Sequence, residues 1–335
     1  MKLKVVYALI SNQNDYYLEQ LLISIYSFRL YHPNATAILV IDHDTNKTII
    51  GKRAIIKSYF SEIKVIEVPN AYNNIQRSRY LKTHLRQFID GDYLFIDTDT
   101  VICCPINDIN EYNYEIGAVA DSNAQLEISE TDEWIVNNAK KMGWTDIIGK
   151  PHFNSGIMLV RDTPITHQLY HKWYDLWVLC SMKGINIDQL ALVKANEELG
   201  FPIKEISGIW NCQILRKGFN HLPQAHIIHY LASNKMSAFY ILGETSTYMQ
   251  IKDLGFIPDN IVQHIKNPHN AFNKSTKIIG ETQINFLKSN IYHIYIYYPF
   301  TYKVLESFAS IYLKTRGYLG NIKSKLKKLL NYHQK

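Results

Sequence analysis

The feature that most constrains the fold is an alternation of wholly apolar segments with segments of helical spacing over about the first 120 residues. Apolar runs in which polar and apolar residues do not alternate are typical of parallel strands buried between helices. The sequence therefore predicts an α/β fold with a mostly parallel, Rossmann-like sheet that helices cover on both faces. We expect strands over residues 4–10, 36–41, 63–68, 93–96 and 116–120, and helices from Leu18 to His32, over 48–60 and over 77–89.

The second half of the 335-residue chain is less regular. Strands are expected over 156–160 and 225–229, and helices over 164–182 and 189–199. Because no Pro/Gly/Ser-rich linker interrupts this part, we expect one domain over residues 1–270. Residues 271–335 are expected to form a separate helical region: one helix over 301–313 and a second, short basic helix after Gly317 and Gly320.

Positive charge is concentrated at the C-terminus. The net charge is +6, yet seven of the 36 basic residues lie after residue 313, where no acidic residue occurs. The rest of the chain is nearly neutral, which argues against a nucleic-acid-binding domain. A basic amphipathic end predicts binding to an anionic membrane surface, and the alternative is a solvated arm.

The expected cellular location rests on the apolar segments, the first ten residues and the cysteines of the sequence. No apolar run reaches the length of a transmembrane helix, and residues 1–10 are interpreted as a first strand instead of a signal peptide. Four cysteines lack metal-site spacing and are expected to be reduced thiols. We expect a cytoplasmic protein that is peripheral on the inner face of the cell membrane.

An Asp-x-Asp pair ends the predicted strand 93–96. Asp97 and Asp99 stand on the same side of the chain, close enough to share a divalent cation. Carboxyl ends of parallel strands are also where such sheets bind ligands. The alternative is that both carboxylates bond turn amides at the end of the strand.

Three further segments offer polar groups, each with an ordinary interpretation beside the functional one. Asn154-Ser155-Gly156 precedes a strand and is typical of a turn with positive φ at Gly156. Asp188 precedes a helix and is a good N-cap residue. His229 ends a predicted strand, and the alternative for it is a hydrogen-bonded histidine of the core.

In order along the chain, these segments resemble glycosyltransferase family 8, which comprises retaining sugar-nucleotide-dependent transferases with the A-type glycosyltransferase fold. The sequence is most similar to bacterial lipopolysaccharide or capsule members. The resemblance covers residues 4–235. It rests on Arg79 in Arg-Tyr-Leu-Lys82, Phe95-Ile-Asp97-Thr-Asp99, Phe153-Asn154-Ser-Gly156, Asp188-Gln189, Trp210-Asn211, and His229-Tyr230 followed by Lys235.

The resemblance implies a role for each matched residue. Asp97, Asp99 and His229 would bind the metal, Mn²⁺ or Mg²⁺, and Asp97 would also contact the donor. Lys235 would bind the donor diphosphate, and Arg79 would lie near the donor sugar and phosphates. Asn154 and Asp188 would bind sugar hydroxyls, and Gln189 would lie below the anomeric carbon, so that Asp188 and Gln189 are the catalytic candidates. Uridine would be held by residues 8–12, including Ala8 and Asn12, with Asp15 and Tyr16 as candidate partners of the base.

The implied function is transfer of a hexose, glucose or galactose, from a UDP-sugar to a glycan or lipid-linked acceptor. Such a reaction needs fixed positive charge against the departing diphosphate, and a metal and a lysine supply it. Two alternatives stay open. One is a sugar nucleotidyltransferase, which the lack of a Gly-rich loop after the first strand disfavours. The other is a catalytically inactive, membrane-associated interaction protein.

Overall fold

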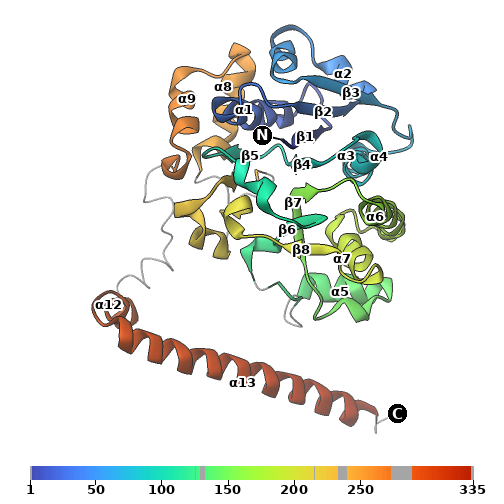
Figure 1. The fold of residues 1–335 in the computed structure, drawn as a ribbon. Coiled ribbons are helices and arrows are strands. Elements are labelled where there is room, and N and C mark those ends of the chain that lie inside the picture. The colour runs from blue at the N-terminus through green and yellow to red at the C-terminus, as the bar shows by residue number, and fades with distance from the viewer. Residues whose placement is uncertain are drawn as a thin grey trace. The chain divides into compact units, whose positions relative to one another are not determined.

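The central sheet has seven strands in the order β3-β2-β1-β4-β7-β6-β8 (Figure 1). The computed structural model describes residues 2–124, 126–128, 133–214, 216–232, 240–272 and 289–332. The chain divides into two units, Met1–Asn273 and Lys274–Lys335, and the sheet belongs to the first. Its strands are β1 (Lys4–Leu9), β2 (Ala37–Asp42), β3 (Glu62–Ile66), β4 (Tyr93–Ile96), β6 (Ile116–Ala120), β7 (Phe153–Val160) and β8 (Ile203–Glu205).

All adjacent strands of this sheet pair in parallel except those that flank β7, which runs antiparallel to β4 and β6. The predicted α/β fold with a mostly parallel sheet is confirmed. The strands β1, β2, β4 and β6 end at the same edge, and β7 begins there. Residues that follow four strands and start a fifth therefore meet at one place.

A smaller sheet lies beside the first, in the order β5-β10-β9. It contains β5 (Thr100–Ile102), β9 (Cys212–Gln213) and β10 (Ile227–His229). β10 pairs antiparallel with β5, which places His229 opposite Thr100 and one residue from Asp99. This pairing joins two segments that are about 130 positions apart in sequence.

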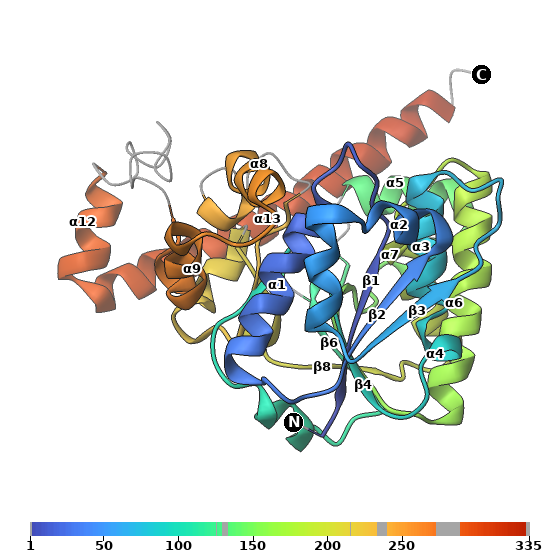
Figure 2. The same cartoon turned by 90° about the horizontal axis from the view of Figure 1, so that it is seen from above.

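Helices cover both faces of the central sheet, as Figure 2 shows. On one face α1 (Tyr17–Tyr31) buries Leu21, Ile25 and Phe28 completely. On the other face lie α3 (Asn74–Thr83), α6 (Pro164–Met182) and α7 (Gln189–Glu198). Burial of one large aliphatic side chain contributes about 1.5–3 kcal/mol, so these two layers supply the main stabilisation of the first unit.

Two predicted helices differ from the structure. Residues 48–60 hold the end of α2 (His43–Thr48) and then a 3₁₀ helix (Gly51–Tyr59). The predicted helix 77–89 begins earlier, at Asn74, because Asn73 and Gln76 form a capping box. It breaks at His84 and continues as α4 (Leu85–Phe88).

β7 is longer than predicted and includes Asn154, Ser155 and Gly156. The expected turn is wrong, since Gly156 is not among the residues with positive φ. What requires glycine here is a close approach: a Cβ at position 156 would lie 2.5 Å from Cε1 of His229. The segment is thus strand, and its glycine makes room for the histidine ring.

Several elements of the first unit were not predicted. Three are helices: α5 (Glu133–Met142), α8 (Thr245–Leu254) and α9 (Asp259–Lys266). Short 3₁₀ segments occur at Asn107–Glu111, Asp121–Asn123, Thr145–Ile147, Gly208–Asn211, Arg216–Asn220, Leu222–Gln224, Ile241–Gly243 and Pro268–Asn270.

The second unit contains α12 (Asn290–Tyr297) and α13 (Pro299–Tyr332). α13 runs through Gly317 and Gly320 without interruption, so the prediction of a separate basic helix after these glycines is wrong. A glycine inside a helix costs about 1 kcal/mol, which neighbouring helix formers such as leucine and lysine offset. In the part of the chain that the structure describes, no helix is both long and apolar enough to cross a bilayer.

Candidate functional site

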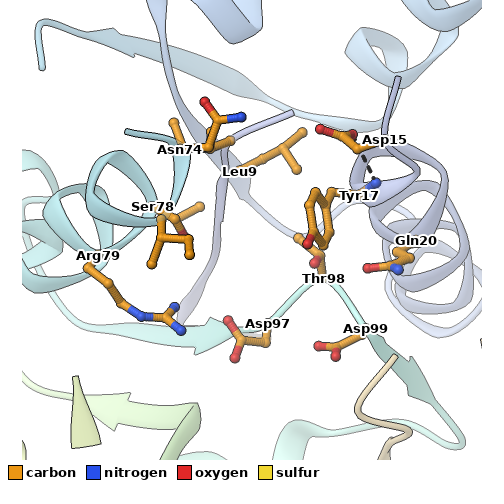
Figure 3. A pocket seen from close by; sticks show the side chains of 13 residues that line it. Leu9, Asp15, Tyr17, Gln20, Asn74, Ser78, Arg79, Asp97, Thr98 and Asp99 are labelled. Atoms are coloured by element: carbon orange, nitrogen blue, oxygen red, sulfur yellow. Dashed lines mark hydrogen bonds between the residues drawn. The ribbon is translucent and has the colours of Figure 1, made fainter. Parts of the chain in front are cut away.

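An open cavity of about 250 Å³ lies at the carboxyl ends of β1 and β4 (Figure 3). Residues 8–10 and 97–99 form the wall that comes from these strands. The loop before α1, the start of α1 and α3 complete it with Asp15, Tyr17, Gln20, Asn74, Ile75, Ser78 and Arg79. This edge is where parallel α/β sheets bind ligands, so the cavity is the candidate site.

Asp97 and Asp99 bracket the bend between β4 and β5. The backbone N–H of Asp97 donates to the Gly156 carbonyl at 2.8 Å, and Tyr230 N donates to the Asp99 carbonyl at 3.1 Å. Oδ2 of Asp99 also accepts the N–H of Ala232 at 2.9 Å. These bonds fix the backbone of both residues, whose side chains line the cavity, as Figure 3 shows.

His229 joins Asp97 and Asp99 in a cluster of three side chains, named the metal group. Its Nε2 lies 3.1 Å from Oδ1 of Asp99, and its Nδ1 lies 3.0 Å from Oδ1 of Asn211. One ligand atom from each of Asp97, Asp99 and His229 lies within 4.8 Å of the others. Two carboxylate oxygens and an imidazole nitrogen are a donor set that suits Mn²⁺ or a similar cation.

The electrostatics of this cluster favour a bound cation. Burial and the neighbouring Asp99 carboxylate raise the pKa of Asp97, although the Lys82 ammonium opposes them. Burial alone would lower the pKa of the His229 imidazole, but the Asp99 and Asp97 carboxylates outweigh it and raise that pKa. Two nearby carboxylates in a buried site repel each other, and a divalent cation between them relieves that repulsion. The residues present therefore fit a metal.

Lys82 is a member of the site that the sequence prediction missed. Its Nζ lies 3.1 Å and 3.3 Å from the two carboxylate oxygens of Asp97, and its side chain is 7% exposed. Lys82 follows Arg79 by three positions on α3, so both cationic side chains leave the same face of the helix. The spacing of these two basic residues is the sequence pattern that points to Lys82 as a site residue.

Arg79, which lines the cavity, forms an ion pair with Asp188. Nε of Arg79 lies 2.9 Å from Oδ1 of Asp188, and Ser155 Oγ donates to Oδ2 of Asp188 at 3.2 Å. Burial alone would raise the pKa of the Asp188 carboxyl, but Arg79 and Lys82 outweigh it and hold that pKa below its ordinary value. Asp188 occupies the N-cap position of α7 as expected, but its side chain makes no capping bond to the helix start and instead faces Arg79.

Asp121 connects two of the predicted residues and was not predicted itself. Its Oδ1 accepts Nδ2 of Asn154 at 3.0 Å and Nε2 of Gln189 at 2.7 Å. Asp121 directly follows the predicted strand 116–120, a position that parallels that of Asp97 after β4. The structure thus brings Asn154, Gln189 and Asp188 together at the same edge as the metal group.

The predicted uridine segment lies only partly in the cavity. Ala8 lines it, whereas Asn12 does not: its Oδ1 accepts the backbone N–H of Asn14 at 2.7 Å. Asp15 lines the cavity and accepts the Ser11 hydroxyl at 2.6 Å. Tyr16 instead stacks on Tyr248 with ring centroids 6.2 Å apart, so Tyr17 and not Tyr16 presents an aromatic ring to the cavity.

Lys235, the predicted diphosphate ligand, lies outside the described residues. Of the other matched segments, Trp210 is buried in the core, and Asn211 is fully buried with its side chain against His229. The structure therefore brings together Arg79, Asp97, Asp99, Asn154, Asp188, Gln189 and His229, with the matched residue Asn211 beside them. It adds Lys82, Asp121 and Tyr17.

No protein-family model matches the sequence, and no curated protein matches it. Solved structures are similar in fold. A galactosyltransferase, LgtC, in complex with donor and acceptor sugar analogues is 16% identical with a TM-score of 0.52, over 78% of this chain and 99% of that chain. An active-site mutant of LgtC is 14% identical with a TM-score of 0.50, over 77% and 98% of the two chains.

The likeness to LgtC extends over nearly the whole of that enzyme. At such low identity it shows the fold and not the reaction. The chain therefore has the A-type glycosyltransferase fold, as the sequence resemblance implied.

Proposed function

We propose that this protein is a metal-dependent retaining glycosyltransferase of the family 8 kind, which moves a hexose from a UDP-sugar to a glycan acceptor. One observation carries the proposal: Asp97 and Asp99, which line a cavity in an A-type glycosyltransferase fold, converge with His229 on one point. The LgtC structure similar in fold is a galactosyltransferase bound to donor and acceptor sugar analogues, which supports the same class of substrates here.

Asp97, Asp99 and His229 would hold the cation, Mn²⁺ or Mg²⁺. When bound, this ion supplies Lewis-acid stabilisation of the negative charge that develops on the departing diphosphate. Lys82 keeps the Asp97 carboxylate oriented at 3.1 Å, and Lys235 is proposed as a second positive charge on the diphosphate. Fixed charges of this kind stabilise the leaving group without a proton transfer.

The donor sugar would lie against Arg79, Asn154, Asp188 and Gln189. The side chain of Asp188 is 3% exposed and ionised next to Arg79, so it is a strong acceptor for sugar hydroxyls. Asp121 takes the Nε2 amide of Gln189, which turns the carbonyl oxygen of Gln189 away from Asp121. We propose that this oxygen lies below the anomeric carbon, with Asp188 and Gln189 as the catalytic residues.

The nucleotide would occupy the part of the cavity between β1 and α1. Tyr17 offers a ring face for stacking with a base, and residues 8–10 form an apolar wall. Stacking of a base on an aromatic side chain contributes about 1–3 kcal/mol. The proposed donor is UDP-glucose or UDP-galactose, used in lipopolysaccharide or capsule synthesis.

Calorimetric titration of the full-length protein with UDP tests the nucleotide assignment. We expect UDP to bind in the presence of Mn²⁺ and to bind at least about tenfold more weakly without it, because Asp97, Asp99 and His229 would hold a cation whose charge attracts the diphosphate. ADP and GDP are the controls for the base. Absence of binding by every nucleotide would favour an interaction protein that retains only the fold.

We further propose that the second unit holds the enzyme at the cytoplasmic face of an anionic membrane, near a lipid-linked acceptor. Residues 290–313 contain only two charged side chains, Lys303 and Glu306. Large apolar side chains there are exposed, among them Phe300 at 80% and Phe308 at 66%. The seven basic residues after 313 would each add roughly 1 kcal/mol near anionic lipid.

Vesicle co-sedimentation tests this placement. The full chain is expected to sediment with vesicles that contain phosphatidylserine and to remain free with pure phosphatidylcholine. Replacement of Lys323, Lys325, Lys327 and Lys328 by glutamine should weaken this binding, and high salt should do the same. Equal sedimentation of the variant and the unmodified protein would contradict the role of the basic end.

A further inference from the structure

A continuous chain of hydrogen-bonded side chains runs across the candidate site, from α7 to the bend before β5. Asp121 accepts from Gln189 at 2.7 Å and from Asn154 at 3.0 Å. Nδ2 of Asn211 donates to Oδ1 of Asn154 at 2.9 Å. The chain continues through His229 at 3.0 Å to Asp99 at 3.1 Å. Asn211, between the two halves, belongs to a matched sequence segment to which the proposed function gives no role.

The donor-to-acceptor direction of these side-chain hydrogen bonds is fixed at Asn154. A carboxylate only accepts hydrogen bonds, so Asn154 turns its Nδ2 toward Asp121. The opposite side of the same amide, Oδ1, accepts the backbone N–H of Gly156 at 2.9 Å. A reversed Asn154 would set acceptor against acceptor at Asp121 and donor against donor at Gly156. Both neighbours therefore select the same orientation.

The orientation of Asn211 follows from that of Asn154. Oδ1 of Asn154 faces Asn211, so Asn211 presents its Nδ2 to it and its own Oδ1 to His229. Asn211 is 0% exposed, so no solvent satisfies a reversed amide. Nδ1 of His229 consequently faces a hydrogen-bond acceptor and keeps its proton as a donor.

We propose that Asn211 is a positioning residue that commits His229 to bind the cation through Nε2. This inference rests on the proposed function, because it concerns the same metal group. With a proton held on Nδ1, the lone pair of the neutral ring is on Nε2, the nitrogen that faces Asp99. A reversed amide at Asn211 would offer N–H to Nδ1, leave the proton on Nε2 and block the cation. Outer partners of this kind orient metal-binding histidines in many proteins.

The test uses the full-length protein, metal-stripped, with Mn²⁺ binding followed by electron paramagnetic resonance. Asn211→Leu keeps the volume but offers no acceptor to Nδ1, and we expect Mn²⁺ affinity to fall about 10–100-fold. Asn211→Asp retains an acceptor toward Nδ1 but sets a carboxylate oxygen against Oδ1 of Asn154, so it is expected to bind Mn²⁺ more tightly than Asn211→Leu. Asn196→Leu is the matched control, because Asn196 is an equally buried asparagine that bonds Ile203 N, away from the metal group.

A second readout identifies the ring nitrogen that binds. In the ¹¹³Cd²⁺-loaded, ¹⁵N-histidine-labelled protein, we expect coupling of cadmium to Nε2 of His229 and a proton on Nδ1. Coupling to Nδ1 in the unmodified protein would overturn the inference even if the variants fail to fold. Equal Mn²⁺ affinity of Asn211→Leu and the unmodified protein would also overturn it, as would an equal loss in Asn196→Leu. If the unmodified protein binds neither Mn²⁺ nor Cd²⁺, the metal assignment of the proposed function fails instead.

Discussion

Nζ of Lys82 lies 3.1 Å from Oδ2 of Asp97, inside the group of side chains that would hold a cation. Asp97 is thus a shared carboxylate: it pairs with a fixed positive charge on α3 and offers a ligand at the end of β4. Burial raises its pKa, and Lys82 is the main group that opposes this effect. The ion pair therefore counteracts the effect of burial on the Asp97 carboxyl.

Lys82→Met should destabilise the metal-free protein by about 1–3 kcal/mol, because it leaves a carboxylate without its partner. The measurement is urea unfolding at neutral pH. In an Asp97→Asn background the same substitution should cost clearly less, since the charge to be compensated is gone. An identical loss of unfolding free energy in both backgrounds would show that the pair is not coupled.

Gly156→Ala should weaken Mn²⁺ binding at least about tenfold. The added Cβ would lie 2.5 Å from Cε1 and 2.9 Å from Nδ1 of His229, so the ring has to leave the position in which its Nε2 faces Asp99. Gly143→Ala is the control for a general loss of stability, because it meets no atom within 4 Å but has a φ of +79°. Unchanged Mn²⁺ affinity in Gly156→Ala would mean that His229 is not a ligand.

Tyr17→Ala should raise KM for the UDP-sugar about tenfold with a smaller effect on kcat, because stacking on a base contributes binding in ground and transition states alike. Tyr17→Phe retains the ring and should behave as the unmodified protein does. Steady-state kinetics with varied donor distinguish the two. If Tyr17→Phe loses as much as Tyr17→Ala, the hydroxyl and not the ring face is the relevant group.

Acid should selectively remove the contribution of Asp188 to stability. Its pKa in the folded protein is lowered, so its stabilisation is complete above the ordinary carboxyl pKa of about 3.9 and is lost as pH falls through the lowered value. The gap in unfolding free energy between the unmodified protein and Asp188→Asn should therefore be constant from about pH 7 to 5 and shrink below about pH 4. A gap that widens on acidification would contradict the ion pair with Arg79.

The strands β1, β2, β4 and β6 were predictable because their apolar runs report burial on both sides, a local property of the sequence. The direction of β7 was not, since antiparallel pairing with β4 depends on tertiary packing. Gly156 illustrates the difference. The glycine is visible in the sequence, but the requirement for glycine comes from the ring of His229, 73 positions later. Lys82 and Asp121 were missed because their sequence patterns, three positions after Arg79 and directly after a predicted strand, are common on protein surfaces. The fold gives these patterns meaning when it places the two residues against Asp97 and Gln189.

Release of UDP from UDP-glucose and UDP-galactose, with and without Mn²⁺, tests the central claim most directly. We predict that at least one of these donors gives UDP in a Mn²⁺-dependent manner. Asp97→Ala and Asp99→Ala should each reduce the rate by about 10²-fold or more, because the leaving diphosphate loses its charge stabilisation. Release that is unchanged in both variants, or that does not depend on the metal, would contradict the assignment of Asp97, Asp99 and His229 as a catalytic metal site.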